Sequence, residues 1–299
     1  MNYMQIATTE NTIYTSPDAS KIFCYTPSII VTPTGRLIVS FDLGGEGVKS
    51  IEGHKSSRAG GSRFGQGKIF ISDDNGQKWT FVQNFPFWHA RLFTIGNSIY
   101  LIGHAGDICI MKSEDNGESW SDTYFLTHGE KWHSSACNVL FSNGNVYLAM
   151  EQRCRLNEVT GWDVAGLSPT LFRACVEDNL CLASSWSRSE KFIYKEVFDG
   201  AKLDFFGIPF YDCETNKPKE IATGINNAPL GWLEANVVKF VDKDHIWHTD
   251  LKEVFHLFLR AHTGGVNYAH LFKIEIQDDQ SMIPSLEHTP SGQKISYIP

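Results

Sequence analysis

Histidine, arginine and carboxylate side chains recur at the ends of short apolar segments in this chain. One set comes directly before such segments and consists of Tyr25, His89, Arg91, His133 and Glu234. A second set follows the partner segments and consists of Asp42, His104, Asp107, Glu151, Arg153, Arg260 and His262. Arginine binds carboxylates through two parallel hydrogen bonds, and histidines and carboxylates with shifted pKa values transfer protons. These residue types predict a polar site for an acidic ligand, with acid–base chemistry, if the fold gathers them.

The apolar segments themselves have the pattern of buried β-strands in antiparallel pairs. They are short and rich in β-branched residues, and turns with Gly or Asn join most partners. The predicted pairs are 28–31 with 37–39, 92–94 with 99–102, 138–141 with 146–148, and 236–240 with 255–259. A weaker hairpin is predicted from 171–175 and 183–186. No segment shows sustained 3.6-residue periodicity, so the sequence predicts an all-β fold.

A motif with the pattern S-x-D-x-G-x-x-W occurs at residues 72–79 and again at 113–120, and its two copies start 41 residues apart. Ser and Asp side chains bond nearby backbone N–H groups, Gly takes a positive φ, and Trp packs back over the turn. Asp74 and Asp115 are therefore expected to be structural. Repeats of this length that are built from strands are typical of β-propellers, whose blades are four-stranded antiparallel sheets.

The geometry of such a blade predicts where the polar residues lie. Turns between the first and second strands, and between the third and fourth, lie on one face of the disc. The start of the first strand and the end of the second lie on the opposite face, near the axis. The polar residues above are therefore expected on one rim, away from the S-x-D-x-G-x-x-W turns. A Gly-rich insert at 44–67 is predicted to be a surface loop, or a segment that covers the site.

Composition and charge limit the class of protein. With 299 residues, 42% hydrophobic, the chain can form one large β domain, predicted to span 1–299. The net charge of −8 argues against a nucleic-acid binder. Seven dispersed cysteines without C-x-x-C suggest reduced thiols and no zinc or redox motif, and we expect neither metal nor cofactor. No signal peptide or membrane span is evident. A cytoplasmic protein is expected, or a secreted or periplasmic one if a leader was removed.

Several segments resemble the sialidase (neuraminidase) superfamily, whose BNR repeats carry the Asp-box motif. They are the two motif copies, residues 25–29 and 33–37, residues 232–236 and residues 259–260. The chain looks most similar to bacterial sialidase-like proteins. The resemblance implies a six-bladed β-propeller that acts on glycans, and the chain could hold an incomplete ring. Glu234 and Arg260 match the family's catalytic Glu and second carboxylate-binding Arg, whereas Tyr25-Thr26-Pro27 replaces the first Arg. Tyr268 is the available counterpart of the late catalytic Tyr.

The first functional hypothesis is a glycoside hydrolase that acts, like an exo-sialidase, on a terminal acidic sugar. Arg153 and Arg260 would hold the substrate carboxylate. Glu234 would act together with a second carboxylate from Asp42, Asp107 or Glu151, because glycosidases use two carboxyl groups in different environments.

The second hypothesis is a polysaccharide lyase that cleaves next to a uronate. Elimination needs a neutralised carboxylate and a basic His or Tyr at the α-carbon. The candidates for that base are His133, His89, His104 and Tyr268.

The third hypothesis is a propeller that binds glycans without cleaving them. Aromatic side chains would then serve as platforms for sugar rings. The candidates are Trp88, Trp132, Trp162 and Trp232.

Overall fold

The structure is a computed structural model, and it describes residues 10–57, 64–134, 138–154, 167–191, 208–209, 231–239, 254–262 and 267–286. The described chain is all-β, apart from short 3-10 helices such as η1 (Glu46–Ser50) and η3 (Ala183–Ser185). Its contacts divide it into two compact units. Unit 1 is Met1–Ala105 with Cys109–Thr123, and unit 2 is Gly106–Ile108 with Tyr124–Pro299. Among the described residues, no helix is long and apolar enough to cross a membrane.

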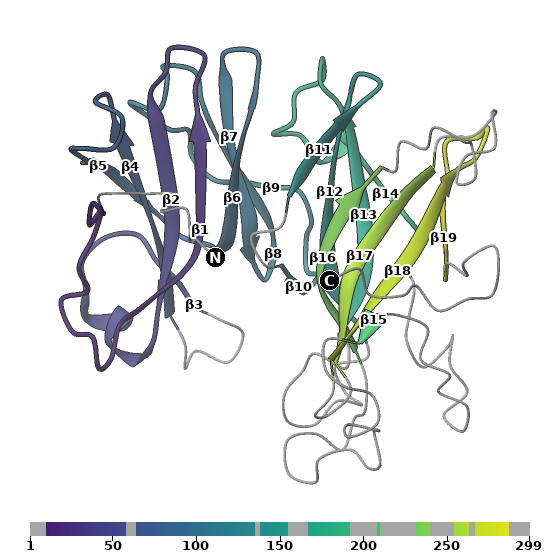
Figure 1. Ribbon diagram of the computed structural model, residues 1–299, viewed down its shortest axis with the longest axis horizontal. Helices are drawn as coiled ribbons and strands as arrows, with labels where there is room; N and C mark the ends of the chain where they lie inside the picture. The colour runs from purple at the N-terminus through teal and green to yellow at the C-terminus, as the bar shows by residue number, and fades with distance from the viewer. Residues whose placement is uncertain are drawn as a thin grey trace, which may run out of the picture. The chain divides into compact units, whose positions relative to one another are not determined.

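Two antiparallel sheets contain the strands up to residue 125 (Figure 1). The first has the order β1-β2-β4-β3, with β5 paired to β4. Its strands are β1 (Phe23–Val31), β2 (Leu37–Gly44), β3 (Ser56–Ser57), β4 (Phe64–Ser72) and β5 (Thr80–Phe85). The second has the order β6-β7-β8-β9, with β6 (Trp88–Ile95), β7 (Ser98–Ala105), β8 (Asp107–Ser113) and β9 (Tyr124–Phe125).

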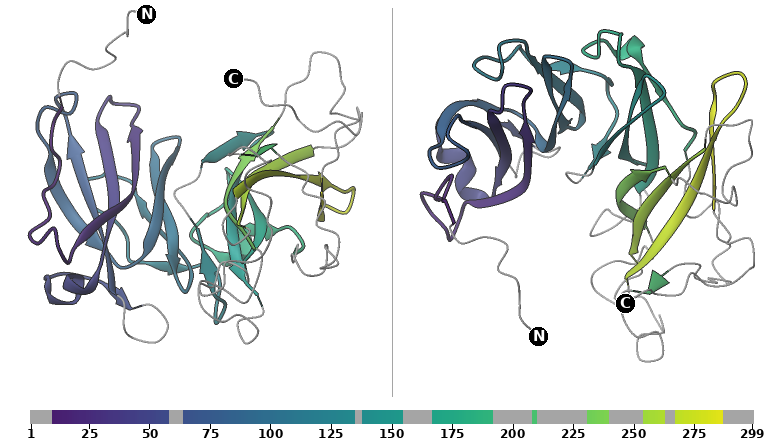
Figure 2. Two further views of the ribbon diagram at one scale, coloured as in Figure 1. Left: turned by 60° about the horizontal axis from the view of Figure 1, so that its bottom comes forward. Right: turned by 45° about the horizontal axis from the view of Figure 1, so that its top comes forward.

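Two further antiparallel sheets follow in unit 2 (Figures 1 and 2). In one, β12 pairs with β10, β11 and β13, and β13 pairs with β14. These strands are β10 (Trp132–His133), β11 (Val139–Ser142), β12 (Asn145–Arg153), β13 (Leu167–Cys175) and β14 (Trp186–Arg188). The other has the order β15-β18-β17-β16, with β19 paired to β18. These strands are β15 (Ile208–Pro209), β16 (Gly231–Val238), β17 (Val254–His262), β18 (Asn267–Ile276) and β19 (Met282–Leu286).

The expected strand pairs are confirmed. β1 pairs with β2, β6 with β7, β11 with β12, and β16 with β17, all antiparallel. The weaker hairpin is present with a shifted second strand: β13 pairs with β14 at 186–188, and residues 183–185 form η3 instead of strand. The fold is thus all-β, with blade-like antiparallel sheets of the propeller type. In the described part of the Gly-rich insert, residues 44–57 and 64–67, the chain forms η1, β3 and the start of β4, and Val48 is completely buried.

Hydrophobic packing in unit 1 lies between its two sheets. A cluster of fully or nearly fully buried side chains joins them, including Ile38, Ile69, Phe85, Leu101 and Cys109. Burial of large apolar side chains such as these is the main favourable term in folding. It holds the ends of β2, β6 and β7 in fixed positions.

The two S-x-D-x-G-x-x-W turns have the same hydrogen bonds. In the first, Ser72 Oγ accepts the N–H of Gly76, and Asp74 Oδ1 accepts the N–H of Lys78, at 2.9 and 2.8 Å. In the second, Gly117 donates to Ser113 Oγ and Ser119 donates to Asp115 Oδ1, both at 2.9 Å. Both Asp side chains are thus used inside their turns, as expected from the sequence.

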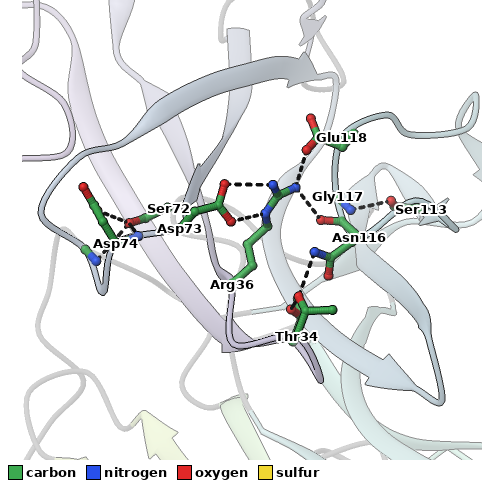
Figure 3. A network of polar contacts seen from close by, with 11 residues as sticks. Thr34, Arg36, Ser72, Asp73, Asp74, Ser113, Asn116, Gly117 and Glu118 are labelled. Atoms are coloured by element: carbon green, nitrogen blue, oxygen red, sulfur yellow. Dashed lines mark hydrogen bonds and ion pairs between the residues drawn. The ribbon is translucent and has the colours of Figure 1, made fainter.

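Arg36, from the hairpin between β1 and β2, bridges the two turns (Figure 3). Its guanidinium binds Asp73 through two bonds of 2.7 and 2.8 Å. It also donates to Glu118 Oε1 at 2.6 Å and to the Asn116 carbonyl at 3.1 Å. The hairpin and both turns therefore lie at the same end of the strands, and Asp42 and His104 are near the opposite end of β2 and β7.

A bulge occurs near the start of the inner strand in three of the four sheets. The register shifts between Tyr25 and Ser28 on β1, between Trp88 and Arg91 on β6, and between Leu233 and Asn236 on β16. Within each bulge one non-glycine residue has a left-handed backbone: Thr26 with φ 52°, His89 with φ 52° and Glu234 with φ 61°. Such conformations cost free energy and usually need support from neighbouring groups.

Candidate functional site

Three of the predicted polar residues meet in unit 1, where β2, β6 and β7 have adjacent ends. The backbone N–H of His89, in the β6 bulge, donates to Asp42 Oδ2 at 2.6 Å. His89 Nδ1 lies 3.1 Å from His104 Nε2, so one ring donates its N–H to the other. The packing of β2 against β6 thus brings together residues far apart in the sequence.

The Asp42 carboxyl group belongs to the protein interior. Its side chain is 0% exposed, and this burial raises its pKa to about 7. Backbone N–H groups of His89 and Ala90 partly offset the effect of burial, and the Thr26 hydroxyl does so to a smaller extent. Oδ1 has no hydrogen-bond partner within normal geometry among the described residues. Asp42 therefore keeps its proton to a higher pH than an ordinary aspartate does.

His104 is also buried, and His89 is the more accessible member of the pair. His104 is 2% exposed, with its ring centroid 5.1 Å from that of His89 and 6.3 Å from that of Trp88. Arg91, on β6, is likewise 2% exposed. A ligand that reaches this cluster from solvent would therefore meet His89 first.

A second cluster lies wholly within unit 2 and centres on Glu151 of β12. Glu151 Oε2 lies 2.9 Å from His133 Nδ1, and its Oε1 accepts the backbone N–H of Ala235 at 2.9 Å. Glu151 is 0% exposed, whereas the His133 side chain is 15% exposed. The register explains the first contact, because His133 and Glu151 are direct partners on β10 and β12.

Glu234 stands directly before Ala235, in the bulge of β16. It is half-buried and has the left-handed backbone described above. Because Glu151 holds the Ala235 N–H, one buried carboxylate contacts both the His133 ring and the backbone next to Glu234. The structure thus brings together His133, Glu151 and the Glu234 segment.

Asp107 and Arg153 have different surroundings from this cluster. Asp107 accepts hydrogen bonds from the Thr127 hydroxyl and from the N–H groups of Gly129 and Glu130, at 2.8–3.0 Å. These bonds shape the loop between β9 and β10. Arg153 is half-buried at the end of β12, where its backbone N–H donates to the Lys131 carbonyl at 2.7 Å.

For Arg260, His262 and Tyr268 the structure gives backbone positions only, because their side chains lie outside the described part. Arg260 pairs with Leu233, His262 with Gly231, and Tyr268 with Ala261. Arg260 therefore occupies the same place on its second strand that Asp42, His104 and Glu151 occupy on theirs.

Sequence reasoning did not identify the polar side chains that join neighbouring inner strands. Ser28 Oγ accepts the N–H of Leu92 at 2.9 Å. The Asn138 side chain donates to the Val237 carbonyl and accepts the Val237 N–H, at 2.6 and 3.0 Å. The sequence pattern that could have identified Ser28 and Asn138 is a single polar residue at the start of each otherwise apolar predicted strand, 28–31 and 138–141.

Two of the tryptophans expected to stack on sugars are inside the protein. Trp88 is 7% exposed and Trp132 is 1% exposed. Trp88 packs so closely on β4 that a Cβ on Gly65 would lie 1.8 Å from its Nε1. Both are therefore core residues and not sugar platforms. Trp162 and the Trp232 side chain lie outside the described part of the chain.

The clusters contain proton-transfer groups but no evident metal site. Among the described residues, no group of three or more His, Cys, Asp or Glu side chains could hold a metal ion. The arrangement offers two imidazoles at partly accessible positions, His89 and His133, and one half-buried carboxylate, Glu234. Imidazole and carboxyl groups are the side chains that most often transfer protons in enzymes.

No protein-family model matches the chain, and no curated protein matches it by sequence. Among solved structures, it is similar to an α-L-arabinofuranosidase from Lactobacillus brevis, with a TM-score of 0.51 and 14% identity over 91% of this chain and 80% of that one. It also matches an α-L-arabinanase from Penicillium chrysogenum, with a TM-score of 0.45 and 12% identity over 91% and 68% of the two chains. An ulvan lyase matches with a TM-score of 0.47 and 14% identity over 88% and 58%. At 14% identity the likeness to the arabinofuranosidase, whose TM-score exceeds 0.5, shows a shared fold alone, and none of these three proteins is a sialidase.

Proposed function

We propose that this protein is a carbohydrate-active enzyme that hydrolyses a glycosidic bond next to an acidic sugar. One observation carries the proposal. The buried carboxylate of Glu151 bonds both the ring of His133 and the backbone next to Glu234, each at 2.9 Å. A proton-transfer group and a carboxylate are thereby held on neighbouring strand ends, and cleavage of an acetal uses a proton donor together with a carboxylate nucleophile or base.

Each group has a role in this proposal. Glu234 attacks the anomeric carbon or activates the water that does so, and His133 transfers the proton to or from the leaving oxygen. Arg260 and Arg153 hold the carboxylate of the sugar, since a guanidinium matches its geometry with two hydrogen bonds. Tyr268 directly precedes Ala269, the register partner of Arg260 on the adjoining strand, and is the candidate tyrosine of the proposed site.

The acidic character of the substrate and an exo-acting, sialidase-like mode are part of the proposal. They follow from the match of Glu234 and Arg260 to sialidase positions. The glycosidases of similar fold lend the general class support, and their own sugars are not carried over. A terminal sialic acid or uronic acid is the first substrate to test.

Elimination next to a uronate is a second candidate, and the geometry of His133 favours it. Glu151 as a carboxylate accepts the hydrogen bond, so Nδ1 of His133 donates it, and Nε2 is the basic nitrogen of the neutral ring. A base of this kind can remove the proton at the α-carbon of a uronate. Asp42, His89 and His104 form the corresponding histidine-containing cluster of unit 1.

A panel of acidic glycans, with products analysed by mass and by ultraviolet absorbance, tests these functions. Hydrolysis adds the mass of water to the products. Elimination adds none and leaves an unsaturated uronate that absorbs in the ultraviolet. The expected result is water addition that disappears in Glu234→Gln and His133→Gln and persists in Asp115→Asn, a control in a turn on unit 1. Binding without any product would contradict both enzymatic functions.

A further inference from the structure

Two buried carboxylates make similar contacts in the two units: the donor is the left-handed bulge residue itself in unit 1 and the residue directly after it in unit 2. Asp42 Oδ2 accepts the N–H of His89 at 2.6 Å, and Glu151 Oε1 accepts the N–H of Ala235 at 2.9 Å. Each carboxylate lies on the second strand of one sheet, and each donor lies in the inner-strand bulge of another sheet of the same unit. Both carboxylates are 0% exposed.

The contact addresses a specific energetic problem. A bulge takes backbone N–H groups out of the strand ladder, and a buried N–H without an acceptor destabilises the fold. The bulge residue also has a left-handed backbone, which is unfavourable for a residue with a side chain. An acceptor with carboxylate character forms a strong hydrogen bond to such an N–H, and thereby stabilises this backbone conformation.

The conformation matters because it sets the direction of the side chain at the bulge. That residue is His89 in unit 1 and Glu234 in unit 2, which are also the most accessible acid–base groups of the β6 and β16 bulges. Glu151 has an additional effect, because its other oxygen bonds His133 Nδ1 and so selects the ring orientation and tautomer.

We propose that Asp42 and Glu151 are positioning residues, each within its own unit: Asp42 holds the bulge that presents His89, Glu151 holds the bulge that presents Glu234, and Glu151 also orients His133. Neither carboxylate contacts the substrate. The inference rests on the proposed function only for its activity measurement. Its structural content holds for a binding protein as well.

The first test measures the Ala235 N–H and the His133 ring without any substrate. The variants are Glu151→Gln, whose amide has one accepting oxygen for two donors, and Glu151→Ala, which has none. Glu130→Gln is the matched control, because Glu130 is near His133 in sequence but bonds Trp132 Nε1 and Arg188. The readouts are amide hydrogen exchange at Ala235 and the 15N chemical shifts of the His133 imidazole.

In the wild type and in Glu130→Gln, we expect a protected Ala235 amide and a His133 ring whose Nδ1 carries the proton in the neutral form. In Glu151→Ala the Ala235 amide should exchange about 10- to 100-fold faster, as expected for the loss of a charge-assisted hydrogen bond, and the ring should lose its preference for that tautomer. Glu151→Gln should keep one of the two wild-type contacts, either the protection of the Ala235 amide or the His133 tautomer, and lose the other. Wild-type exchange and wild-type ring shifts in both Glu151 variants would overturn the proposal.

The second test uses whichever glycan the protein turns over. A positioning role predicts a lower kcat with little change in KM for Glu151→Gln, together with an altered pH profile. Suppose instead that KM rises at unchanged kcat while amide exchange at Ala235 and the His133 shifts change as expected. This result would show that Glu151 contacts the substrate, and it would overturn the statement that it does not. If no glycan is turned over, the proposed function fails while the exchange and ring measurements still decide the positioning role.

The same design applies to unit 1. Asp42→Asn keeps one accepting oxygen for the His89 N–H, whereas Asp42→Ala removes it. Amide exchange at His89 should therefore remain slow in Asp42→Asn and become about 10-fold faster or more in Asp42→Ala. Slow exchange at His89 in a folded Asp42→Ala variant would contradict the role of Asp42.

Discussion

At the scale of single residues, this protein uses similar side chains for different purposes. Asp42 and Glu151 are fully buried and bind backbone N–H groups, whereas Glu234 is half-buried in a bulge. Asp74 and Asp115 accept backbone N–H groups within their own turns. Burial and hydrogen-bond partners therefore distinguish the carboxylate proposed for chemistry from those that build the fold.

The backbone of Glu234 leads to a prediction that separates strain from chemistry. Glu234→Gly and Glu234→Ala both remove the carboxylate, but only glycine relieves the left-handed conformation at φ 61°. Both variants should lose activity, and Glu234→Gly should be more stable than Glu234→Ala by about 1 kcal/mol. Denaturant unfolding of the two variants measures this difference. Equal stabilities would show that the bulge relaxes when the glutamate is removed.

Arg260 allows a prediction about charge recognition. If it holds the substrate carboxylate, Arg260→Ala should cost about 2–5 kcal/mol in transition-state stabilisation. Arg260→Lys should recover little of this, because an ammonium group cannot form the paired hydrogen bonds of a guanidinium. Comparison of kcat/KM for the three proteins is the measurement. Full activity in both Arg260→Ala and His133→Ala would refute the proposed site.

At the scale of elements, the two S-x-D-x-G-x-x-W turns share the same hydrogen bonds to backbone N–H groups. They differ in the hydrogen bonding of the tryptophan indole N–H. Trp79 and Trp120 are both half-buried, and each packs on a hydrophobic cluster of unit 1. Trp79 Nε1 donates to the Gly76 carbonyl at 3.0 Å. Trp120 Nε1 is buried and has no hydrogen-bond partner among the described residues.

This difference predicts unequal effects of the same substitution. Trp79→Phe loses a hydrogen bond and should destabilise the protein by about 1 kcal/mol beyond the loss of ring contacts. Trp120→Phe removes an unsatisfied N–H, so it should be less harmful than Trp79→Phe by a similar amount. Thermal unfolding of the two variants checks the order, and neither should affect the ligand site selectively. The reverse order would mean that the Trp120 N–H has an acceptor.

At the scale of the whole molecule, Asp42 makes stability depend on pH. Its pKa is about 7 in the folded protein and has an ordinary value of 3.8, so between these values the folded state binds more protons than the unfolded state. The contribution of Asp42 to the free energy of unfolding is therefore largest below pH 4 and falls as the pH rises from 4 to 7. Above pH 7 it stays at its lower value. The difference corresponds to about 4 kcal/mol at most.

Asp42→Asn stays neutral at every pH and should lack this dependence. Relative to the variant, the wild type should lose stability between about pH 4 and pH 7 and then run parallel to it. Chemical unfolding at a series of pH values is the measurement. Asp115→Asn is the control: the Ser119 side chain and N–H lower the pKa of Asp115, so its contribution is lost only at more acidic pH. A wild type that tracks Asp42→Asn across this range would show that Asp42 is charged throughout.

The sequence by itself determined the strand pairs, the turns and the all-β class. These features depend on local chemistry: short apolar runs, Gly and Asn at positive φ, and Ser and Asp side chains that bond backbone groups a few residues away. For this reason the roles of Asp74 and Asp115 and the pairing of β1 with β2 could be predicted from residues within one hairpin.

Only the tertiary structure decided what the strand-end residues do. Burial and hydrogen bonding depend on packing between sheets, which brings Asp42 to His89 over 47 residues and Glu151 to Ala235 over 84. No local pattern reports such contacts, so the sequence did not show that Asp42 and Glu151 are fully buried whereas Glu234 is half-buried. They differ because a buried carboxylate needs a fixed donor, and the bulges of neighbouring inner strands supply it.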